Sequence, residues 1–160
     1  MAAILIDTNV LVYAHDRGEF AKQGQALQML NSLYATGNGR LSVQCLVEFF
    51  RAVTRGPTPK LTVTEAAQQV ERLARAWTVL DITPFIVLEA IRGVHDHQLA
   101  YWDAQIWATA RLNQIPFVLS EDFSAGTVLE GVRFVNPFAG DFDLDAWLPP
   151  GNGIRNTQHD

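Results

Sequence analysis

Short apolar runs alternate with longer amphipathic segments along most of this 160-residue chain, and this alternation limits its fold most. The runs have strand length, and the segments between them carry apolar residues at helical spacing, as Ala66, Val70 and Leu73 do. Repeated strand–helix–strand order predicts an α/β fold with a mainly parallel sheet and helices on both faces. The predicted strands cover 2–6, 41–43, 77–82, 116–120 and 131–136, and the predicted helices cover 20–34, 44–55, 62–77, 84–95 and 100–114.

The chain length suits one domain, and nothing in the sequence reads as a linker or an internal repeat. No apolar run is long enough to cross a bilayer, and the first residues lack the basic and small-residue features of a secretory signal, so we expect a cytoplasmic protein. The single cysteine, Cys45, allows no internal disulfide and is expected to be a small buried residue. The polar tail 139–160 contains Phe142, Leu144, Trp147 and Leu148, which are candidates for docking on the body.

The net charge of −5 neither indicates nor excludes a nucleic-acid partner. The segment from Asp141 onward holds four acids and one base, which leaves 13 acids against 11 bases in the rest of the chain. Ten of the twelve cations are arginines, whose planar fork suits bidentate phosphate contacts. The charge balance therefore leaves the partner open.

Acidic side chains follow two of the predicted strands. Asp7 comes directly after the run ILI, and Ser120, Glu121 and Asp122 follow the run FVL. Since ligands of open parallel sheets bind at the carboxyl ends of the strands, both groups are expected to face one crevice.

Two further acids, Glu48 and Asp103, interrupt apolar helical surroundings in CLVEFF and YWDAQIW. Such an acid either lies at the helix surface or is turned inward and compensated. Clustered carboxylates raise one another's pKa unless a cation holds them, and Mg²⁺ or Mn²⁺ prefers oxygen ligands. Four acids together therefore indicate a site for one or two divalent ions, of the kind that clamps an in-line phosphoryl displacement.

Four blocks of the sequence, in this order, resemble the PIN-domain ribonucleases, and in particular the VapC-type toxins of bacterial toxin–antitoxin pairs. They are IDTNVLVYA, the acid of LVEFF, YWDAQIWATARLNQIPFVLSEDFSAG and GVRFVNPF. The resemblance implies a PIN-like three-layer α/β/α sandwich with a short, mainly parallel central sheet over residues 1–138, followed by the tail 139–160. By position, it implies that Asp7, Glu48, Asp103 and Asp122 are the catalytic, metal-binding acids, with Thr8, Asn9 and Ser120 as supporting residues.

The resemblance also implies an activity and partners. The activity is Mg²⁺- or Mn²⁺-dependent hydrolysis of RNA phosphodiester bonds, which leaves a 5′-phosphate and a 3′-hydroxyl. The partners are an RNA substrate, a small antitoxin protein and a second copy of the chain in a homodimer, with no membrane. The alternative is a non-catalytic PIN-like RNA-binding or scaffold module.

Other candidate residues have simpler interpretations. Glu121 competes with Asp122 as a ligand, and we expect it to be exposed. His95 and His97 do not share a helix face at their spacing, so a surface pair is favoured over a metal pair. Arg51 and Arg55 are either phosphate ligands or solvated cations. Trp102 and Trp107 stack on bases or, by default, belong to the core or a dimer contact.

Two other enzyme classes fit poorly. A haloacid-dehalogenase-type phosphatase needs a second Asp two residues after the first, where this chain has Asn9. A receiver-type phosphoacceptor needs a late lysine, but the only lysines are Lys22 and Lys60.

Overall fold

The structure is a computed structural model of the chain, and it describes residues 2–124 and 126–146. Its strands form one sheet in the order β3-β2-β1-β4-β6-β5, in which every neighbouring pair is parallel except β5 with β6. The strands are β1 Ile4–Ile6, β2 Gly39–Ser42, β3 Thr78–Leu80, β4 Phe117–Leu119, β5 Val128–Leu129 and β6 Val132–Val135. The helices are α1 Thr8–Tyr13, α2 Phe20–Thr36, α3 Val43–Thr54, α4 Val63–Ala76, α5 Pro84–His97 and α6 Tyr101–Leu112, with a 3₁₀ turn at Leu144–Ala146.

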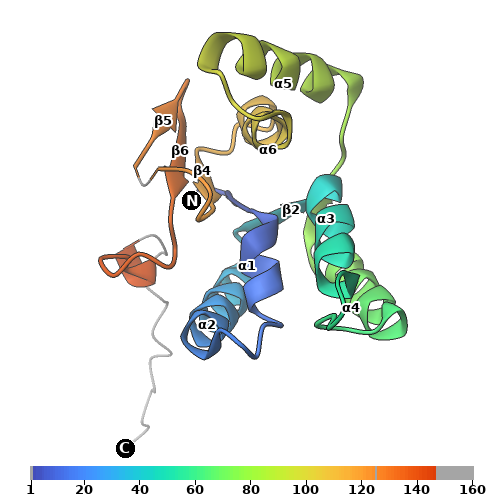
Figure 1. Cartoon of the computed structure of the whole chain (residues 1–160). Coiled ribbons are helices and arrows are strands. Elements are labelled where there is room, and N and C mark those ends of the chain that lie inside the picture. Colours follow the sequence, from blue (N-terminus) through green and yellow to red (C-terminus); the bar gives the residue numbers. More distant parts are fainter. Residues whose placement is uncertain (1, 125, 147–160) are drawn as a thin grey trace, which may run out of the picture.

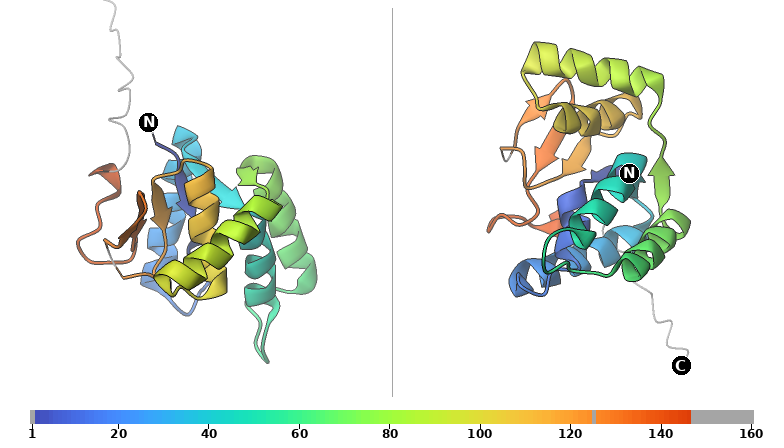
Figure 2. Two further views of the ribbon diagram at one scale, coloured as in Figure 1. Left: turned by 90° about the horizontal axis from the view of Figure 1, so that it is seen from above. Right: turned by 45° about the vertical axis from the view of Figure 1, so that its right-hand side comes forward.

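Helices cover both faces of the sheet. Figure 1 shows α5 and α6 on one side of the strands and α1 and α2 on the other, and Figure 2 gives two further views of the same layers. The central strand β1 has all three of its residues buried, as expected for a strand that is covered on both faces. The three-layer α/β/α fold with a mainly parallel sheet is confirmed.

Local sequence signals explain where the long helices begin. The Ser42 side chain accepts a hydrogen bond from the Cys45 N–H at the start of α3. Thr62 and Glu65 form a reciprocal capping box at the start of α4. Thr83 caps α5, and Pro84 occupies the first turn of that helix, where its missing N–H has no intrahelical partner.

The structure contains two elements that the sequence pattern does not predict. Helix α1 follows Asp7 directly and spans only 6 residues. Strand β5 has 2 residues and pairs with β6 through a turn in which Glu130 and Gly131 adopt positive φ angles. Both segments are shorter than the windows over which helical or strand periodicity is visible.

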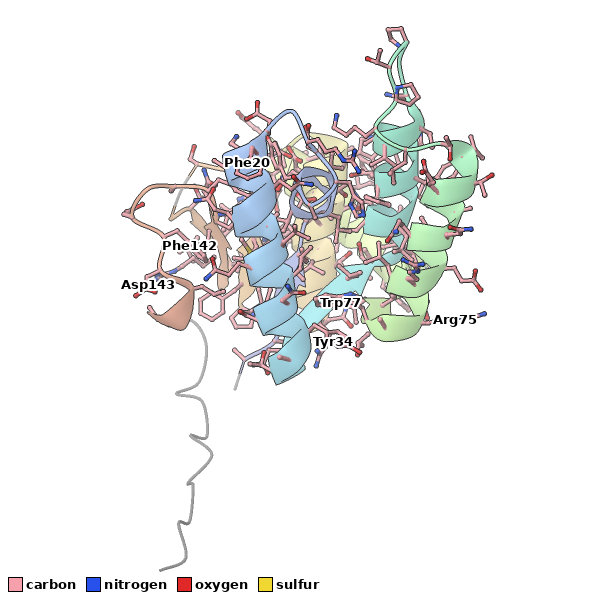
Figure 3. The ribbon with its side chains drawn as sticks, turned by 90° about the horizontal axis from the view of Figure 1, so that it is seen from below. Phe20, Tyr34, Arg75, Trp77, Phe142 and Asp143 are labelled. Carbon is pink, nitrogen blue, oxygen red and sulfur yellow. The ribbon has the colours of Figure 1, made fainter. Side chains whose placement is uncertain are left out.

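The described part of the tail packs against the body. Phe142 and Leu144 are partly buried against the core, and Figure 3 shows Phe142 beside the sheet and the 3₁₀ turn. The Tyr13 and Phe138 rings meet edge to face with centroids 4.9 Å apart. Trp147 and Leu148 lie outside the described residues, and the domain boundary at residue 138 stays a prediction.

Within the described residues, we find no helix with the length and apolar character that a membrane span requires.

Candidate active site

The order in which the chain adds strands to the sheet reverses between β1 and β4. Strands β2 and β3 lie on one side of β1, while β6 and β5 lie beyond β4. The parallel register pairs Ile6 with Leu119, so the next residues, Asp7 and Ser120, stand side by side at the carboxyl edge. Ligands of open α/β sheets bind at such a switch point.

Asp7 is held by several hydrogen bonds at this edge. Its Oδ1 accepts from the Thr8 N–H at 2.7 Å, and its Oδ2 accepts from Ser120 Oγ at 2.7 Å. The Asn9 amide also donates to Oδ2, at 3.4 Å. Only 4% of Asp7 is exposed, and this burial raises the pKa of its carboxyl to about 7 despite those hydrogen bonds, with the negative charges of Asp122 and Glu48 adding to the rise.

Asp122 is tied to the same cluster through Asn9 and Ser120. Asn9 Nδ2 donates to Asp122 Oδ2 at 3.2 Å and to Ser120 Oγ at 3.2 Å. The Asp122 N–H in turn donates to Ser120 Oγ at 3.1 Å, which fixes the loop after β4. The Asn9 side chain therefore stands between Asp7 and Asp122.

Glu48 reaches the site from α3. Thr8 Oγ1 donates to Glu48 Oε2 at 3.0 Å, and Gln44 Nε2 donates to Glu48 Oε1 at 2.8 Å. Thr8 therefore joins the start of α1 to Glu48, while its backbone N–H holds Asp7. One threonine thus positions two of the four acids.

A chain of buried amides connects Glu48 to α6, and the sequence interpretation missed it. Gln105 Nε2 donates to Gln44 Oε1 at 2.8 Å, Gln44 Nε2 also donates to the Trp102 carbonyl at 3.0 Å, and Tyr101 OH donates to Gln105 Oε1 at 2.9 Å. Both glutamines are 5% exposed, and buried polar groups of this kind specify one arrangement when all are satisfied. The available signal was the i, i+4 spacing of Gln44 and Glu48 on one helix face.

Asp103 lies in the first turn of α6, where a negative charge suits the helix dipole. Burial raises the pKa of the Asp103 carboxyl, and the negative charges of Asp122 and Glu48 raise it further. Within residues 2–124 and 126–146, Asp103 has no hydrogen-bond or ion-pair partner. No described residue therefore compensates the Asp103 charge.

The expectation that Glu121 is exposed is wrong. Its side chain is 23% exposed and forms an ion pair with Lys22 Nζ at 3.0 Å. Tyr13 OH donates to the other carboxylate oxygen at 2.5 Å. Glu121 is therefore neutralised by α1 and α2 beside the cleft, which leaves Asp122 as the acid of this pair that faces the cluster.

An open cleft of about 610 Å³ lies beside Glu48 and Asp122, whereas Asp7 and Asp103 do not line it. Acidic and polar residues from three elements meet there with cations from α3 and the following loop. The lining includes Thr8, Asn9, Tyr13, Asp16, Glu48, Arg51, Arg55, Lys60, Glu121 and Asp122.

The donor set suits a hard divalent cation by its chemistry, because it consists of carboxylate, hydroxyl and amide oxygens. In the part of the chain that the structure describes, none of the four acids forms an ion pair. Asn9 Oδ1 is a buried acceptor that no described residue satisfies. Among the described residues, however, no group of three acidic, histidine or cysteine side chains has an arrangement that could hold a metal ion. Neutral donors, chiefly Asn9 and Thr8, span the acids instead.

The remaining candidates have structural roles. Cys45 is fully buried, and burial raises the pKa of its thiol to about 12. His95 and His97 contact different partners, Asp96 and Glu130. The expected surface pair is correct for His95 but wrong for His97, whose side chain is 23% exposed and meets the Trp107 ring edge to face. Trp107 is fully buried as a core residue, and Gly93 leaves room for it, since a Cβ there would lie 2.7 Å from its ring. Trp102, by contrast, is 60% exposed.

Residues 4–125 match the family model described as the PIN domain, which covers most of the chain. The chain belongs to the PIN domain family. Nucleases of this family generally use divalent metal ions. Comparison of this PIN domain with curated proteins gave no match.

Solved structures share the fold of this PIN domain at low sequence identity. The toxin VapC20 of Mycobacterium tuberculosis, which cleaves the sarcin–ricin loop, is 24% identical with a TM-score of 0.62, over 82% of this chain and 99% of that one. A toxin–antitoxin complex from Klebsiella pneumoniae is 18% identical with a TM-score of 0.63, over 85% and 98%. DNA-bound VapBC from Salmonella typhimurium is 16% identical with a TM-score of 0.62, over 84% and 97%.

Proposed function

We propose that this PIN domain is a metal-dependent ribonuclease. The proposal is supported by three carboxylates, Asp7, Glu48 and Asp122, that Thr8 and Asn9 link at the switch point of the sheet, and by Asp103, whose pKa the charges of Asp122 and Glu48 raise; no cation is paired to any of the four in the described part of the chain. Asp7, Glu48, Asp103 and Asp122 would hold Mg²⁺ or Mn²⁺, and Thr8, Asn9 and Ser120 would orient those acids. When bound, the ion supplies a hydroxide from water and stabilises charge on the phosphoryl oxygens.

The protein's own residues supply positioning. Ser120 and Thr8 fix both oxygens of Asp7, and Gln44 fixes Glu48 against α6. Asn9 keeps Asp7 and Asp122 on the same side of the crevice. Because Asp7, Glu48 and Asp122 are held before any ion arrives, less conformational entropy is lost when the ion binds.

The test is cleavage of purified tRNA, rRNA and mRNA with Mg²⁺ or Mn²⁺ present, followed by mapping of the cut ends. We expect products with 5′-phosphate and 3′-hydroxyl ends that disappear with a chelator and in Asp7→Asn. Binding of RNA that needs no metal and gives no cleavage would contradict the proposal and favour a non-catalytic module.

We further propose that the protein is the toxin of a toxin–antitoxin pair and acts in the cytoplasm. The solved structures with this fold include a toxin and toxin–antitoxin complexes, which supports a small antitoxin as partner. Expression of the chain should arrest growth, Asp7→Asn should remove the arrest, and co-expression with the antitoxin encoded beside it should restore growth. Harmless overexpression of an active nuclease would contradict the toxin role.

We also propose a homodimer. Helix α5 exposes Phe85, Leu88 and Ile91, which are 75%, 63% and 53% exposed, and a second copy would remove this apolar surface from water. Light scattering of the purified chain should give twice the monomer mass, whereas a monomer at all concentrations would contradict the proposal.

A further inference from the structure

Three cationic side chains line the cleft and pair with none of the four acids. Arg51 follows Glu48 on α3 at i+3 and shares its face of the helix, Arg55 is the C-cap residue directly after α3, and Lys60 follows in the loop before α4. All three line the same cleft as Glu48 and Asp122. The cleft therefore has an acidic end and a basic end.

The two arginines differ from Arg75, Arg92 and Arg111, the described arginines that pair with carboxylates. Arg75 pairs with Glu71 at 2.5 Å, and Arg92 pairs with three carboxylates. Within the described residues, neither Arg51 nor Arg55 has a carboxylate within ion-pair distance. An arginine pair that faces a cleft without anionic partners is available to bind an anionic ligand.

We propose that Arg51 and Arg55 bind phosphates of the RNA strand that flank the phosphate being cleaved. This inference rests on the proposed ribonuclease function. The rise of the helix places Arg55 about 10 Å along the axis from Glu48, which is far enough to reach a neighbouring phosphate while the acidic end holds the scissile one. Guanidinium groups contact phosphate oxygens bidentately and give affinity without base preference.

Lys60 has a smaller part in this phosphate-binding wall. Its Nζ lies 3.6 Å from Asp16 Oδ2, which also lines the cleft, so its charge is partly neutralised. Arg51 and Arg55 therefore carry the proposal, and the experiment leaves Lys60 unchanged.

The experiment measures binding of a fluorescently labelled single-stranded RNA to the full chain by anisotropy, in Ca²⁺ and over a series of salt concentrations. The test variant is Arg51→Gln/Arg55→Gln. The matched control is Arg72→Gln/Arg75→Gln on α4, which removes the same charge from residues that are described by the structure but do not line the cleft. A second variant, Arg51→Lys/Arg55→Lys, keeps the charge.

We expect the slope of log affinity against log salt to fall by about 1.4 in Arg51→Gln/Arg55→Gln, because each lost phosphate contact to a single strand removes about 0.7. Affinity at low salt should fall about tenfold, and KM for cleavage in Mn²⁺ should rise more than kcat falls. The Arg72→Gln/Arg75→Gln control and the lysine variant should keep the wild-type slope. Matching thermal unfolding curves would show that all variants fold.

An unchanged slope in Arg51→Gln/Arg55→Gln, or an equal loss in the α4 control, would overturn the proposal. If the wild type cleaves RNA while the arginine variant keeps its slope and KM, the phosphate-binding proposal fails and the ribonuclease function stands. If the wild type binds RNA but never cleaves it, and the salt slope falls only in Arg51→Gln/Arg55→Gln, the ribonuclease proposal fails and the phosphate-binding proposal stands. Absence of RNA binding by the wild type would overturn both.

Discussion

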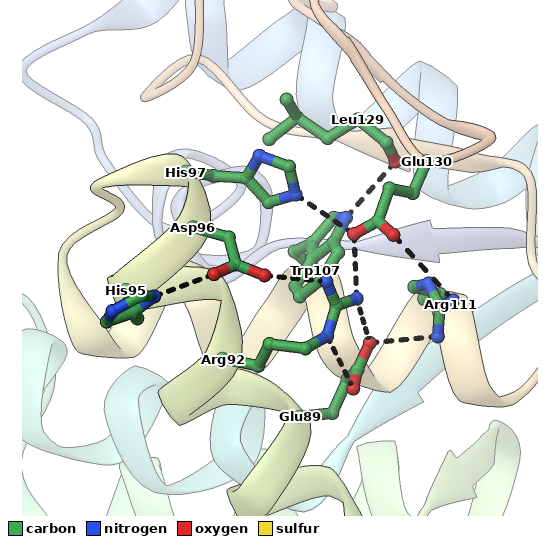
Figure 4. A network of polar contacts seen from close by, with 9 residues as sticks. All are labelled: Glu89, Arg92, His95, Asp96, His97, Trp107, Arg111, Leu129 and Glu130. Carbon is green, nitrogen blue, oxygen red and sulfur yellow. Dashed lines mark hydrogen bonds and ion pairs between the residues drawn. The ribbon is translucent and has the colours of Figure 1, made fainter.

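Three carboxylates surround Arg92 between α5 and the β5–β6 turn. In the described residues, by contrast, the four acids Asp7, Glu48, Asp103 and Asp122, here called the sheet-edge group, pair with no cation. Figure 4 shows the first group: Arg92 contacts Glu89 and Asp96 from its own helix and Glu130 from the β5–β6 turn. Arg111 adds a contact to Glu89 at 2.8 Å. Both groups contain carboxylates. Arginines neutralise those around Arg92, whereas no described cation pairs with those of the sheet-edge group.

The pKa values follow this difference. Hydrogen bonds from Arg92 lower the pKa of the Glu89 carboxyl, and hydrogen bonds from His97 and Arg92 lower that of Glu130. Burial raises the pKa of Asp7 and of Asp103, and the neighbouring acids raise both further. Arg92 thus supplies the cation of its group, while no described residue supplies one to the sheet-edge group, which is the basis of the proposal that this group takes its cation from solution.

Removing one acid from each group sharpens this comparison most. Asp103→Asn should lower the rate of RNA cleavage in Mn²⁺ on the order of 10²–10³-fold, because the remaining acids would hold and orient the ion poorly. Glu89→Gln is the matched control in the Arg92 group and should keep the wild-type rate. Single-turnover cleavage measures both, and equal rates for the two variants would break the comparison.

Removal of an acid should raise the free energy of unfolding in the sheet-edge group and lower it in the Arg92 group. Without divalent ions, Asp7→Asn should stabilise the fold by about 2 kcal/mol at pH 8. The folded pKa of Asp7 is about 7 against an ordinary 3.8, so wild-type stability falls as the pH rises between those values, because the unfolded state releases a proton that the folded state still holds. Asparagine removes this loss, so the gain should shrink toward pH 4.

Urea denaturation of the apo-protein at pH 4 and pH 8 measures this effect. Added Mn²⁺ should stabilise the wild type and not Asp7→Asn, because only the intact site binds the ion. Destabilisation of the metal-free Asp7→Asn variant at pH 8 would show that the Asp7 charge is already compensated.

A smaller effect is expected in the Arg92 group. Glu89→Gln should lower the free energy of unfolding by about 1 kcal/mol at pH 7, since the Glu89 side chain is 15% exposed and contacts two arginines. The pKa of Glu89 is lowered in the folded state, so its contribution is present above its unfolded pKa and is lost as the pH falls through the folded one. The loss in Glu89→Gln should therefore vanish in acid, and a loss that persists there would indicate a packing effect instead.

Periodicity and strand-end position predicted much of this fold. The run ILI before Asp7 and the run FVL before Ser120 are strands, and their parallel pairing brings the following residues together. Helix α1 escaped prediction because a 6-residue helix carries too little periodicity and depends on Asp7 as its cap.

Contacts between distant segments were harder to predict. The Gln44–Gln105 hydrogen bond joins residues 61 positions apart, and no local pattern signals it. In the Arg92 group, the spacing of Glu89, Arg92 and Asp96 is visible along one helix, but Glu130 joins from 38 positions away. The burial of Glu121 was missed because its partner Lys22 lies 99 positions away on α2, and no local pattern signals that contact.

Calorimetric titration of Mn²⁺ into the metal-free protein tests the central claim most directly. The wild type and Glu89→Gln should bind Mn²⁺ with the same affinity, while Asp7→Asn should bind at least about tenfold more weakly. Asp7→Asn binding as tightly as the wild type, or Glu89→Gln losing as much affinity as Asp7→Asn, would contradict the assignment of the sheet-edge carboxylates as the metal site.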